Sequence, residues 1–316
     1  MRIVFCGTPA LAVPSLQNLL GQPDFEVVAV LTQPDRPRGR GQEVSLSAVK
    51  LAAQAAGIAL HQPETVRAPE VQQLLEGLKP DAIAIIAYGQ IIPARLLPIP
   101  KLGWINVHAS LLPKYRGAAP INWAIANGET KTGVTTMRID AGMDTGEMLL
   151  RREMGIAPEE TAPELAARMA ELGAPLLAET LRGMVAGTIQ PQAQDGGAAT
   201  YAPMLEKEDG RIDWKRPAQE IYNRMRGFAP WPGAYTAFRA QLCHLWGEPV
   251  SNTAREKPAA GTPGTLAHAS GAVLVACGDA TLLRLTSVKL EGRKEIAASE
   301  FANGARLANG ERFGEG

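Results

Sequence analysis

The chain has few cysteines and no excess of charge of either sign. Its three cysteines, Cys6, Cys243 and Cys277, are far apart and form no Cys-x-x-Cys pair, which argues against a disulfide framework and favours a reducing compartment. We therefore expect a cytoplasmic protein. Lysine and arginine together number 32, as do aspartate and glutamate, so the net charge indicates no particular class of partner.

Long hydrophobic runs are also missing. The most apolar internal run, DAIAIIAYG (81–89), is far shorter than the roughly 20 residues that a membrane helix needs. Near the N-terminus, Gly7 and Pro9 interrupt the apolar stretch before a signal-peptide core is complete. We expect neither a membrane segment nor a secretion signal.

The patterns of two common sites are absent. Gly7 follows the first apolar run, but no second glycine stands at the offset of the Gly-x-Gly-x-x-Gly pattern that binds dinucleotides. The histidines His61, His244 and His268 have no partners at metal-ligand spacing. The sequence therefore disfavours a dinucleotide enzyme and predicts no metal site.

Apolar runs alternate with amphipathic stretches through the first half. The runs at 2–5, 26–32 and 81–87 are continuous and β-branched, as strands covered on both faces are. Stretches with helical spacing separate or follow them, at 14–20, 44–57 and 68–78. Further strands are expected at 103–109, 133–139 and 146–154, and further helices at 118–128 and within 161–187. This order predicts an α/β fold with a doubly wound, mostly parallel, Rossmann-like sheet.

The composition changes after the last of these helices. Residues 188–214 show little periodic pattern and are rich in Gln, Gly, Asp and Pro, which predicts a linker. A short helix candidate at 218–228 precedes strand-like pieces at 234–238, 241–246, 264–269, 272–277 and 281–288. Their spacing favours a small barrel or sandwich. For 316 residues we expect a first domain at 1–189, a linker at 190–207 and a second domain at 208–316.

Polar groups gather at the end of one expected strand. In INVHASLLPKYRG (105–117), Asn106 and His108 stand two residues apart and therefore on one face of the strand, at the edge of the sheet where ligands bind. A third group, Asp144, lies in the glycine-rich turn DAGMDTG (140–146). Each residue alone has an ordinary structural interpretation, as a satisfied core polar group or an Asx-turn. Two polar groups on one face of an apolar strand favour a functional role.

These three side chains suggest a direct transfer reaction. No serine or cysteine nucleophile stands beside them, so a covalent intermediate is not indicated. Asn106 is suited to donate a hydrogen bond to a developing oxyanion, and His108, oriented by Asp144, to carry a proton. Such a set suits an amine that attacks an acyl or formyl carbonyl carried on another nitrogen.

The segment INVHASLLPKYRGAAPINWAI, followed by DAGMDTG, resembles the signature of the formyltransferases that use 10-formyltetrahydrofolate. The resemblance implies that 10-formyltetrahydrofolate is the formyl donor, that no metal is needed, and that Asn106, His108 and Asp144 are the catalytic residues. In that family the matching Asn and His polarise the formyl oxygen, and the Asp assists proton removal from the amine. The resemblance also assigns folate binding to one turn and one loop, with Ser110, Leu111, Leu112 and Pro113 in the turn and Tyr88, Gln90, Ile91 and Ile92 in the loop.

Members of this family formylate different acceptors, among them glycinamide ribonucleotide, amino sugar nucleotides, water and methionyl-tRNA. The stretch TQPDRPRGRGQEVS (32–45) resembles the loop of the members that formylate initiator methionyl-tRNA for translation initiation. Its arginines Arg36, Arg38 and Arg40 form a cationic segment suited to phosphate, and Arg40 matches the arginine that enters the acceptor stem. Gln42 and Glu43 replace consecutive lysines of relatives, which predicts fewer phosphate contacts from this loop.

The C-terminal part fits the same interpretation. RIDW (211–214) and FAPWPGAYT (228–236) resemble the start of the oligonucleotide-binding (OB)-like β-barrel that binds tRNA in those members. By position, tRNA contacts are expected from Lys207 and, beyond it, from Arg211, Lys215, Arg224, Arg226 and Lys289. We expect a monomer. A formyltransferase for amino sugar nucleotides and a non-catalytic RNA-binding or folate-sensing module are the alternatives.

Overall fold

The computed structural model describes residues 1–38, 43–250, 261–269 and 271–314. The chain divides into two compact units. Unit 1 comprises Met1–Pro120, Lys131–Gly155 and Glu164–Pro203, and unit 2 comprises Ile121–Thr130, Ile156–Pro163 and Met204–Gly316. Two short segments from the first half of the chain thus belong to unit 2. The three-part division expected from the sequence stays a prediction.

A seven-stranded sheet forms the centre of unit 1, in the order β5-β2-β1-β6-β7-β8-β9. The strands are β1 (Arg2–Gly7), β2 (Glu26–Leu31), β5 (Leu60–His61), β6 (Ala82–Ile86), β7 (Trp104–His108), β8 (Lys131–Arg138) and β9 (Met148–Gly155). The pairings from β5 to β7 are parallel, and the two that join β7, β8 and β9 are antiparallel. The sheet confirms the mostly parallel, doubly wound fold.

Helices cover both faces of this sheet. On one face, α1 (Val13–Leu20), α2 (Ala48–Ala55) and α5 (Ala162–Ala186) pack on strand residues such as Phe5 and Val30. On the other, α3 (Pro69–Leu78) and the 3-10 turn η2 (Ala94–Leu96) pack on Val4, Ile85 and Trp104. Local signals place the helix starts, because α1 and α3 carry proline in the first turn and the Ser47 hydroxyl caps α2. A 3-10 turn, η1 (Ala10–Ala12), precedes α1.

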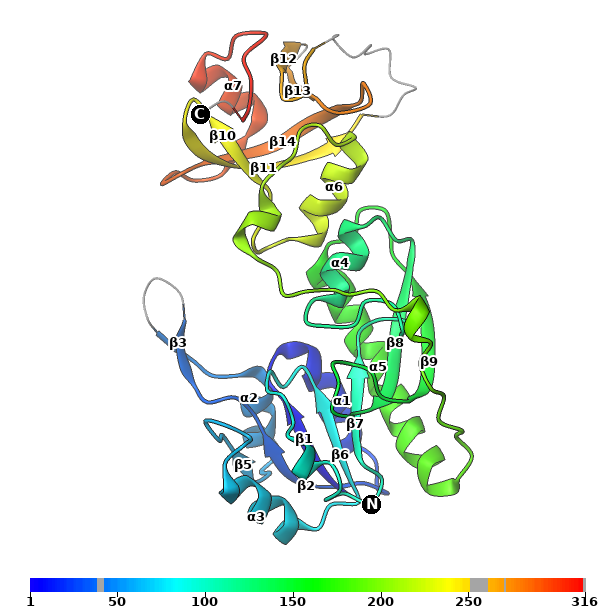
Figure 1. Ribbon diagram of the computed structural model, residues 1–316. Coiled ribbons are helices and arrows are strands. Elements are labelled where there is room, and N and C mark those ends of the chain that lie inside the picture. The colour runs from blue at the N-terminus through cyan, green and yellow to red at the C-terminus, as the bar shows by residue number, and fades with distance from the viewer. Residues whose placement is uncertain (39–42, 251–260, 270, 315–316) are drawn as a thin grey trace. The chain divides into compact units, whose positions relative to one another are not determined.

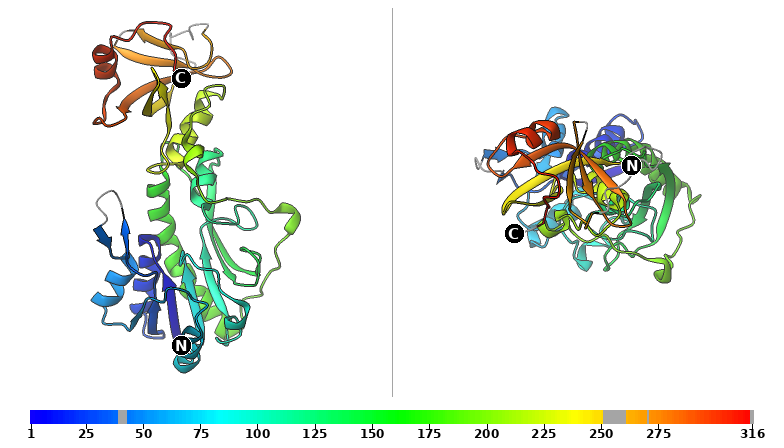
Figure 2. Two further views of the ribbon diagram at one scale, coloured as in Figure 1. Left: turned by 60° about the vertical axis from the view of Figure 1, so that its left-hand side comes forward. Right: turned by 90° about the horizontal axis from the view of Figure 1, so that it is seen from above.

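A two-stranded hairpin, β3 (Arg36–Arg38) and β4 (Glu43–Ser45), stands away from the sheet in both views of unit 1 (Figures 1 and 2). A polar cluster at its base ties it to the body of the unit. Lys50 of α2 bonds to Asp35 and, at 3.0 Å, to Gln62 Oε1, while Gln62 Nε2 donates to the Gln33 carbonyl. The direction of the hairpin is therefore fixed at its base by Lys50 of α2 and by Gln62, which follows β5.

Residues 188–203 form a return segment that lies against unit 1. It contains the 3-10 turn η3 (Gly196–Ala198). Gln192 exchanges two backbone hydrogen bonds of 2.8 Å with Met148 at the start of β9, and Arg116 pairs with Tyr201. These hydrogen bonds use backbone groups, so they leave no periodic pattern of apolar residues in the sequence. For this reason the sequence pattern predicts a linker here. In the structure, the return segment packs against the start of β9 and the loop after β7.

Unit 2 is built around an antiparallel sheet in the order β10-β11-β14-β13-β12, with β15 paired to β14. Its strands are β10 (Tyr235–Phe238), β11 (Gln241–Pro249), β12 (Leu266–Ala269), β13 (Ala272–Ala276), β14 (Leu282–Leu290) and β15 (Ile296–Ala297). Its helical elements are α4 (Pro120–Ala126, of which Pro120 belongs to unit 1), η4 (Lys207–Gly210), α6 (Ala218–Gly227) and α7 (Ala298–Ala305). The core contains Met225 of α6, Leu245 of β11 and Phe301 of α7. This β-rich unit confirms the expected small barrel-like second part. Among the described helices, none is long and apolar enough to cross a membrane.

Candidate active site

Strand β7 brings Asn106 and His108 to the carboxyl edge of the sheet. It lies between β6 and β8, with Ile85 opposite Asn106 and Thr135 opposite His108. Because side chains alternate along a strand, both residues share the face of Trp104, which packs in the core beneath α3. His108 is buried and Asn106 half-buried. Within the described residues, the Asn106 side chain has no hydrogen-bond partner, which leaves its amide available to a ligand.

The His108 ring is held between a carbonyl and a carboxylate. Its Nε2 lies 2.9 Å from the Tyr115 carbonyl oxygen, and its Nδ1 lies 3.6 Å from Asp144 Oδ2. Since a carbonyl only accepts hydrogen bonds, Nε2 carries the proton in the neutral ring. Nδ1 is then the nitrogen that gains or loses a proton, and it faces Asp144.

Asp144 is presented by a tight turn between β8 and β9. Its backbone is left-handed, with φ of 52°, and its Oδ2 accepts a 2.8 Å hydrogen bond from the Gly117 N–H. The turn is so compact that only glycine fits at position 146, because a Cβ there would lie 1.9 Å from the Arg138 carbonyl oxygen. The Asp144 side chain is 19% exposed, so its carboxylate faces His108 and is also in contact with solvent. The sequence-predicted triad residues therefore lie around one edge of unit 1.

The turn that follows β7 contains Ser110, Leu111, Leu112 and Pro113. Thr135 of β8 fixes it, donating to the Ser110 carbonyl at 2.7 Å and accepting from the Leu112 N–H at 3.2 Å. Ser110 and Leu112 are fully buried. Their side chains support the turn from inside, so contacts to a ligand are left to backbone groups and to the half-buried Leu111 and Pro113.

The loop after β6 contains Tyr88, Gln90, Ile91 and Ile92. Left-handed backbone at Ala87 and Gly89 shapes it, and the Tyr88 carbonyl accepts hydrogen bonds from Thr8 and Gln33 at 3.0 and 3.1 Å. Tyr88 and Ile92 are buried, whereas the Ile91 side chain is 73% exposed. Burial raises the pKa of the Tyr88 phenol. Gln90 Oε1 accepts from the Val66 N–H at 2.6 Å, so this residue anchors the loop.

A hollow of about 510 Å³ lies beside this loop in unit 1. Its lining includes Thr8 after β1, Gln33, Arg36 and Ser47. Arg36 is largely exposed and only loosely paired with Glu64, at 3.6 Å. Of the other predicted tRNA residues in the hairpin, Arg38 ends β3, and Arg40, like Gln42, lies outside the described residues.

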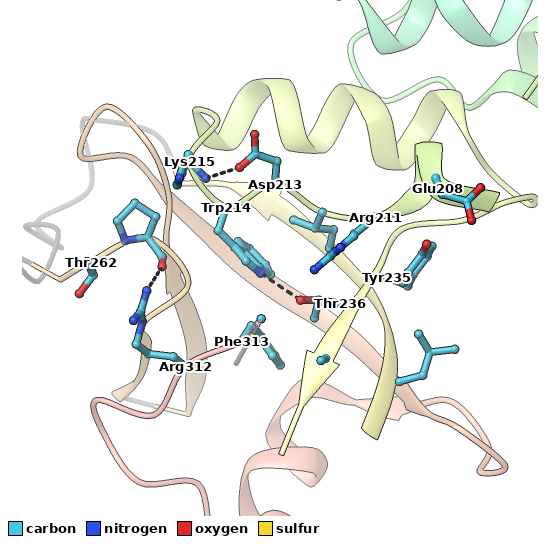
Figure 3. Close-up of a pocket in the computed structure, with 15 residues that line it drawn as sticks. Glu208, Arg211, Asp213, Trp214, Lys215, Tyr235, Thr236, Thr262, Arg312 and Phe313 are labelled. Atoms are coloured by element: carbon cyan, nitrogen blue, oxygen red, sulfur yellow. Dashed lines mark hydrogen bonds between the residues drawn. The ribbon is translucent and has the colours of Figure 1, made fainter. Parts of the chain in front are cut away.

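Unit 2 carries the remaining predicted tRNA contacts. Lys207, at the start of η4, and Lys289 of β14 are exposed. Arg211 and Lys215 line a hollow of about 980 Å³ together with Tyr235 and Arg312, and its buried floor includes Trp214, whose indole N–H donates to Thr236 Oγ1 at 3.2 Å (Figure 3).

Two of the predicted arginines have packing roles instead. Arg226 is buried and donates to the Glu160 carbonyl at 2.7 Å and to Asn223 Oδ1 at 2.7 Å. Arg224 lies over the Phe228 ring, 4.8 Å from its centroid. Desolvation lowers the pKa of both guanidinium groups. Residue type alone does not reveal this burial, because arginine is usually exposed.

The described part of the chain contains no group of three His, Cys, Asp or Glu residues that could hold a metal ion. The three cysteines are buried and unpaired. Burial raises the pKa of the Cys243 and Cys277 thiols to about 12, so neither is a reactive thiolate at neutral pH. The polar groups that the structure gathers near the end of β7 are the Asn106 amide, the His108 imidazole and the Asp144 carboxylate.

Sequence reasoning missed several groups that support this site. Thr135 and the Tyr115 carbonyl position the β7 edge, and Gln194 of the return segment bonds to the turn that carries Asp144. Thr135 and Gln194 lie in no motif, and a backbone carbonyl such as that of Tyr115 leaves no trace in the residue type. Only the convergence of distant segments reveals them.

Comparison with known proteins agrees with this geometry. The formyl transferase family model matches residues 1–181, and the model of the formyl transferase C-terminal domain matches residues 204–306. Methionyl-tRNA formyltransferase of Solibacter usitatus is 56% identical over 317 aligned residues, which cover 100% of this chain and 99% of that protein. The enzyme of the same name from Acidobacterium capsulatum is 50% identical, over 99% of this chain and all of that protein.

Among solved structures, the sugar 3N-formyltransferase WlaRD has the same fold. Its TM-score is 0.63 at 19% identity, over 93% of this chain and 99% of that chain. This similarity extends through both units, although at such identity it concerns the fold alone. The family models and the full-length relatives show that the chain is an enzyme of the formyl transferase family, in the branch of the methionyl-tRNA formyltransferases.

Proposed function

We propose that the chain transfers the formyl group of 10-formyltetrahydrofolate to the free amino group of initiator methionyl-tRNA. The observation that carries this proposal is the placement of Asn106, His108 and Asp144 around one edge of the sheet. The full-length relatives named methionyl-tRNA formyltransferase support the choice of acceptor.

The reaction that fits the site is an addition followed by an elimination. The methionine amino nitrogen attacks the formyl carbon, and the carbonyl π electrons move to oxygen to give a tetrahedral oxyanion. The bond between that carbon and the folate nitrogen then breaks. One proton leaves the amine and one reaches the departing folate nitrogen, so the products are N-formylmethionyl-tRNA and tetrahydrofolate.

Asn106 and His108 are suited to stabilise the oxyanion. The Asn106 amide is half-buried and has no partner among the described groups. It can therefore donate a hydrogen bond to the anionic oxygen without breaking an existing one. His108 has one ring nitrogen committed to the Tyr115 carbonyl. When Nδ1 is protonated, its hydrogen faces Asp144, so the ring stabilises the oxyanion through its positive charge.

Asp144 is suited to receive or relay the proton of the amine. Its carboxylate faces His108 Nδ1 and keeps contact with the surface, while the Gly117 N–H fixes one of its oxygens. A carboxylate held in this way stabilises an imidazolium and orients it. The pair thereby holds a proton during the attack without a metal ion.

The folate donor is proposed to bind between the loop after β6 and the turn after β7. Tyr88, Ile92, Ser110 and Leu112 are buried, so they shape these segments, and backbone groups with the exposed Ile91 face the ligand. The left-handed residues Ala87 and Gly89 turn the peptide groups of the loop sharply, which suits recognition of a flat, polar ring by backbone donors and acceptors.

The tRNA is proposed to contact the hairpin of unit 1 and the β-rich unit 2. Arg36, Arg38 and Arg40 in the hairpin region, with Lys207, are the proposed contacts. Unit 2 then serves as the tRNA-binding domain. We also propose that the chain acts as a monomer in the cytoplasm.

A comparison of two acceptors in separate assays tests the proposed function. The purified chain is incubated with labelled 10-formyltetrahydrofolate and either methionyl-tRNA or a dTDP-linked amino sugar. We expect label on methionyl-tRNA only. Label on the sugar nucleotide alone would replace this proposal by the alternative acceptor, and turnover of neither, with retained tRNA binding, would indicate a binding module.

A further inference from the structure

Gln194 makes more contacts with the Asp144 turn than its place in a supposed linker suggests. Its Nε2 donates to the Asp144 carbonyl and to the Gly146 carbonyl, each at 2.8 Å. Its Oε1 accepts from Arg116 Nε at 3.0 Å and Nη2 at 2.8 Å. Both hydrogens of the amide nitrogen and both lone pairs of its oxygen are therefore used.

The orientation of this amide is determined by its partners. Backbone carbonyls only accept hydrogen bonds and a guanidinium only donates. A flipped amide would place its oxygen against the two carbonyls and its NH₂ group against Arg116, with four unfavourable contacts. Gln194 is thus a fixed bridge between Arg116, which is only 5% exposed, and the turn of residues 140–146.

The turn needs such a bridge because its backbone is not relaxed. Asp144 has the left-handed φ of 52°, a conformation that costs a non-glycine residue free energy unless the surroundings hold it. Within the turn, Asp140 accepts hydrogen bonds from the Gly142 N–H and from Thr145 Oγ1. Gln194 holds the turn from outside, at the carbonyls of Asp144 and Gly146.

We infer that Gln194 is a positioning residue for formyl transfer, which holds the Asp144 carboxylate at its place beside His108. This inference rests on the proposed function. Gln194 touches neither His108 nor the reacting atoms in the described contacts, so it acts through Asp144. Small errors in the placement of a catalytic group cost large factors in rate, whereas binding of folate and tRNA uses other surfaces. The expected effect is therefore on kcat.

Two substitutions separate the two sides of the bridge. Gln194→Leu removes all four hydrogen bonds at similar size. Gln194→Glu keeps an acceptor for Arg116 but replaces the donor with an oxygen that faces the two carbonyls. Gln192→Leu is the matched control, because Gln192 lies two residues away in the same segment, is exposed, and contacts Met148 through its backbone alone.

The test is steady-state formylation of methionyl-tRNA by the full chain, with the melting temperature of each variant measured alongside. We expect both Gln194 variants to lose tenfold or more in kcat, with both KM values within twofold of wild type, and Gln192→Leu to match wild type. Wild-type kcat in either Gln194 variant would overturn the inference. So would a rate loss that follows the unfolded fraction at the assay temperature. A wild-type chain that formylates nothing would overturn the proposed function as well, and is distinguished by the wild-type assay itself.

Discussion

The polar residues of β7 lie where apolar side chains would be easier to bury. Its other inward side chains, Trp104 and Ile105, pack into the two cores of unit 1. The Asn106 amide is half-buried, so it loses part of its contact with water on folding without gaining a hydrogen bond among the described groups. Asn106 therefore contributes less to the stability of the fold than an apolar residue would, and its amide is available as a donor at the carboxyl edge of the sheet.

Replacing Asn106 tests this interpretation at a single residue. We expect Asn106→Ala to lower kcat for formyl transfer on the order of 10²-fold or more, because one oxyanion donor is lost, while the melting temperature stays the same or rises. Asn303→Ala, at an exposed position of α7, is the control in the same rate assay. Near-normal turnover of Asn106→Ala would remove the proposed role.

His244 of β11 gives unit 2 a pH dependence. Burial against Tyr235 lowers the pKa of His244, and Lys289 and Lys207 lower it further. Because its folded pKa lies below the unfolded value of roughly 6.5, the unfolded chain binds more protons as the pH falls through that value. The contribution of His244 to the free energy of unfolding is therefore fully present above the unfolded pKa, and it decreases as the pH falls below that value.

Thermal unfolding at pH 7 and pH 5 checks this sign. We expect the melting temperature of the wild-type chain to fall on acidification, and the fall to be smaller in His244→Gln, which has no titrating group there. Calorimetry of both proteins in matched buffers gives the comparison. An identical fall in the two proteins would show that His244 is not a source of the pH dependence.

At the scale of elements, helix α5 and strand β7 approach closely because Gly173 has no side chain. A Cβ at this position would lie 2.9 Å from Val107 Cγ1. Overpacking of this kind costs roughly 1–3 kcal/mol. Since Val107 lies between Asn106 and His108, this contact also limits how closely β7 and α5 can pack.

A pair of glycine substitutions tests that packing. Gly173→Val should lower the free energy of unfolding by roughly 1–3 kcal/mol. Gly77→Ala in α3, where a Cβ meets nothing within 4 Å, should raise it by roughly 0.5–1 kcal/mol. Denaturant titration measures both changes. Two changes of the same sign would contradict the packing described here.

The sequence predicts the elements whose signal is local. The strands β1, β2 and β6 are continuous apolar runs. The helices α1, α3 and α5 carry helical spacing with proline or glycine near their ends. The helix α7, with the short sequence ASEFANGA, has a glycine and an asparagine and gives no such signal. The return segment escapes prediction because backbone bonds to Met148 and Arg116 hold it.

The site is predictable to a similar extent. Asn106 and His108 can be recognised because they interrupt an apolar strand at its end, and Asp144 because glycines surround it. The approach of Asp144 to His108, across 36 positions of the chain, depends on β8 and on Gln194. Neither has a sequence pattern that indicates this role.

At the scale of the whole molecule, the two proposed substrates differ in charge. The formyl acceptor, methionyl-tRNA, is a polyanion, whereas the formyl donor, 10-formyltetrahydrofolate, is not. Arg36 is 65% exposed in its side chain and only loosely paired, so a phosphate competes easily for it. Phosphate binding releases counterions, and each lost contact lowers the salt dependence by about one counterion. The two substrates should therefore respond differently to salt.

Salt titration of the two KM values checks this difference. We expect KM for methionyl-tRNA to rise steeply with salt and KM for folate to change little. Arg36→Ala should raise KM for methionyl-tRNA several-fold and flatten its salt dependence, whereas Lys101→Ala, exposed in the turn before β7 and therefore at the opposite edge of the sheet, should not. Equal effects on both substrates would contradict a role of the hairpin in tRNA binding.

The most direct measurement is formyl transfer from labelled 10-formyltetrahydrofolate to initiator tRNA that is charged with methionine, beside the same tRNA uncharged. The uncharged tRNA has every phosphate contact but no amino group to attack the formyl carbon. We predict labelled N-formylmethionyl-tRNA from the charged form and no label on the uncharged one. No transfer to the charged tRNA, or equal label on both, would contradict the account of how Asn106, His108 and Asp144 act.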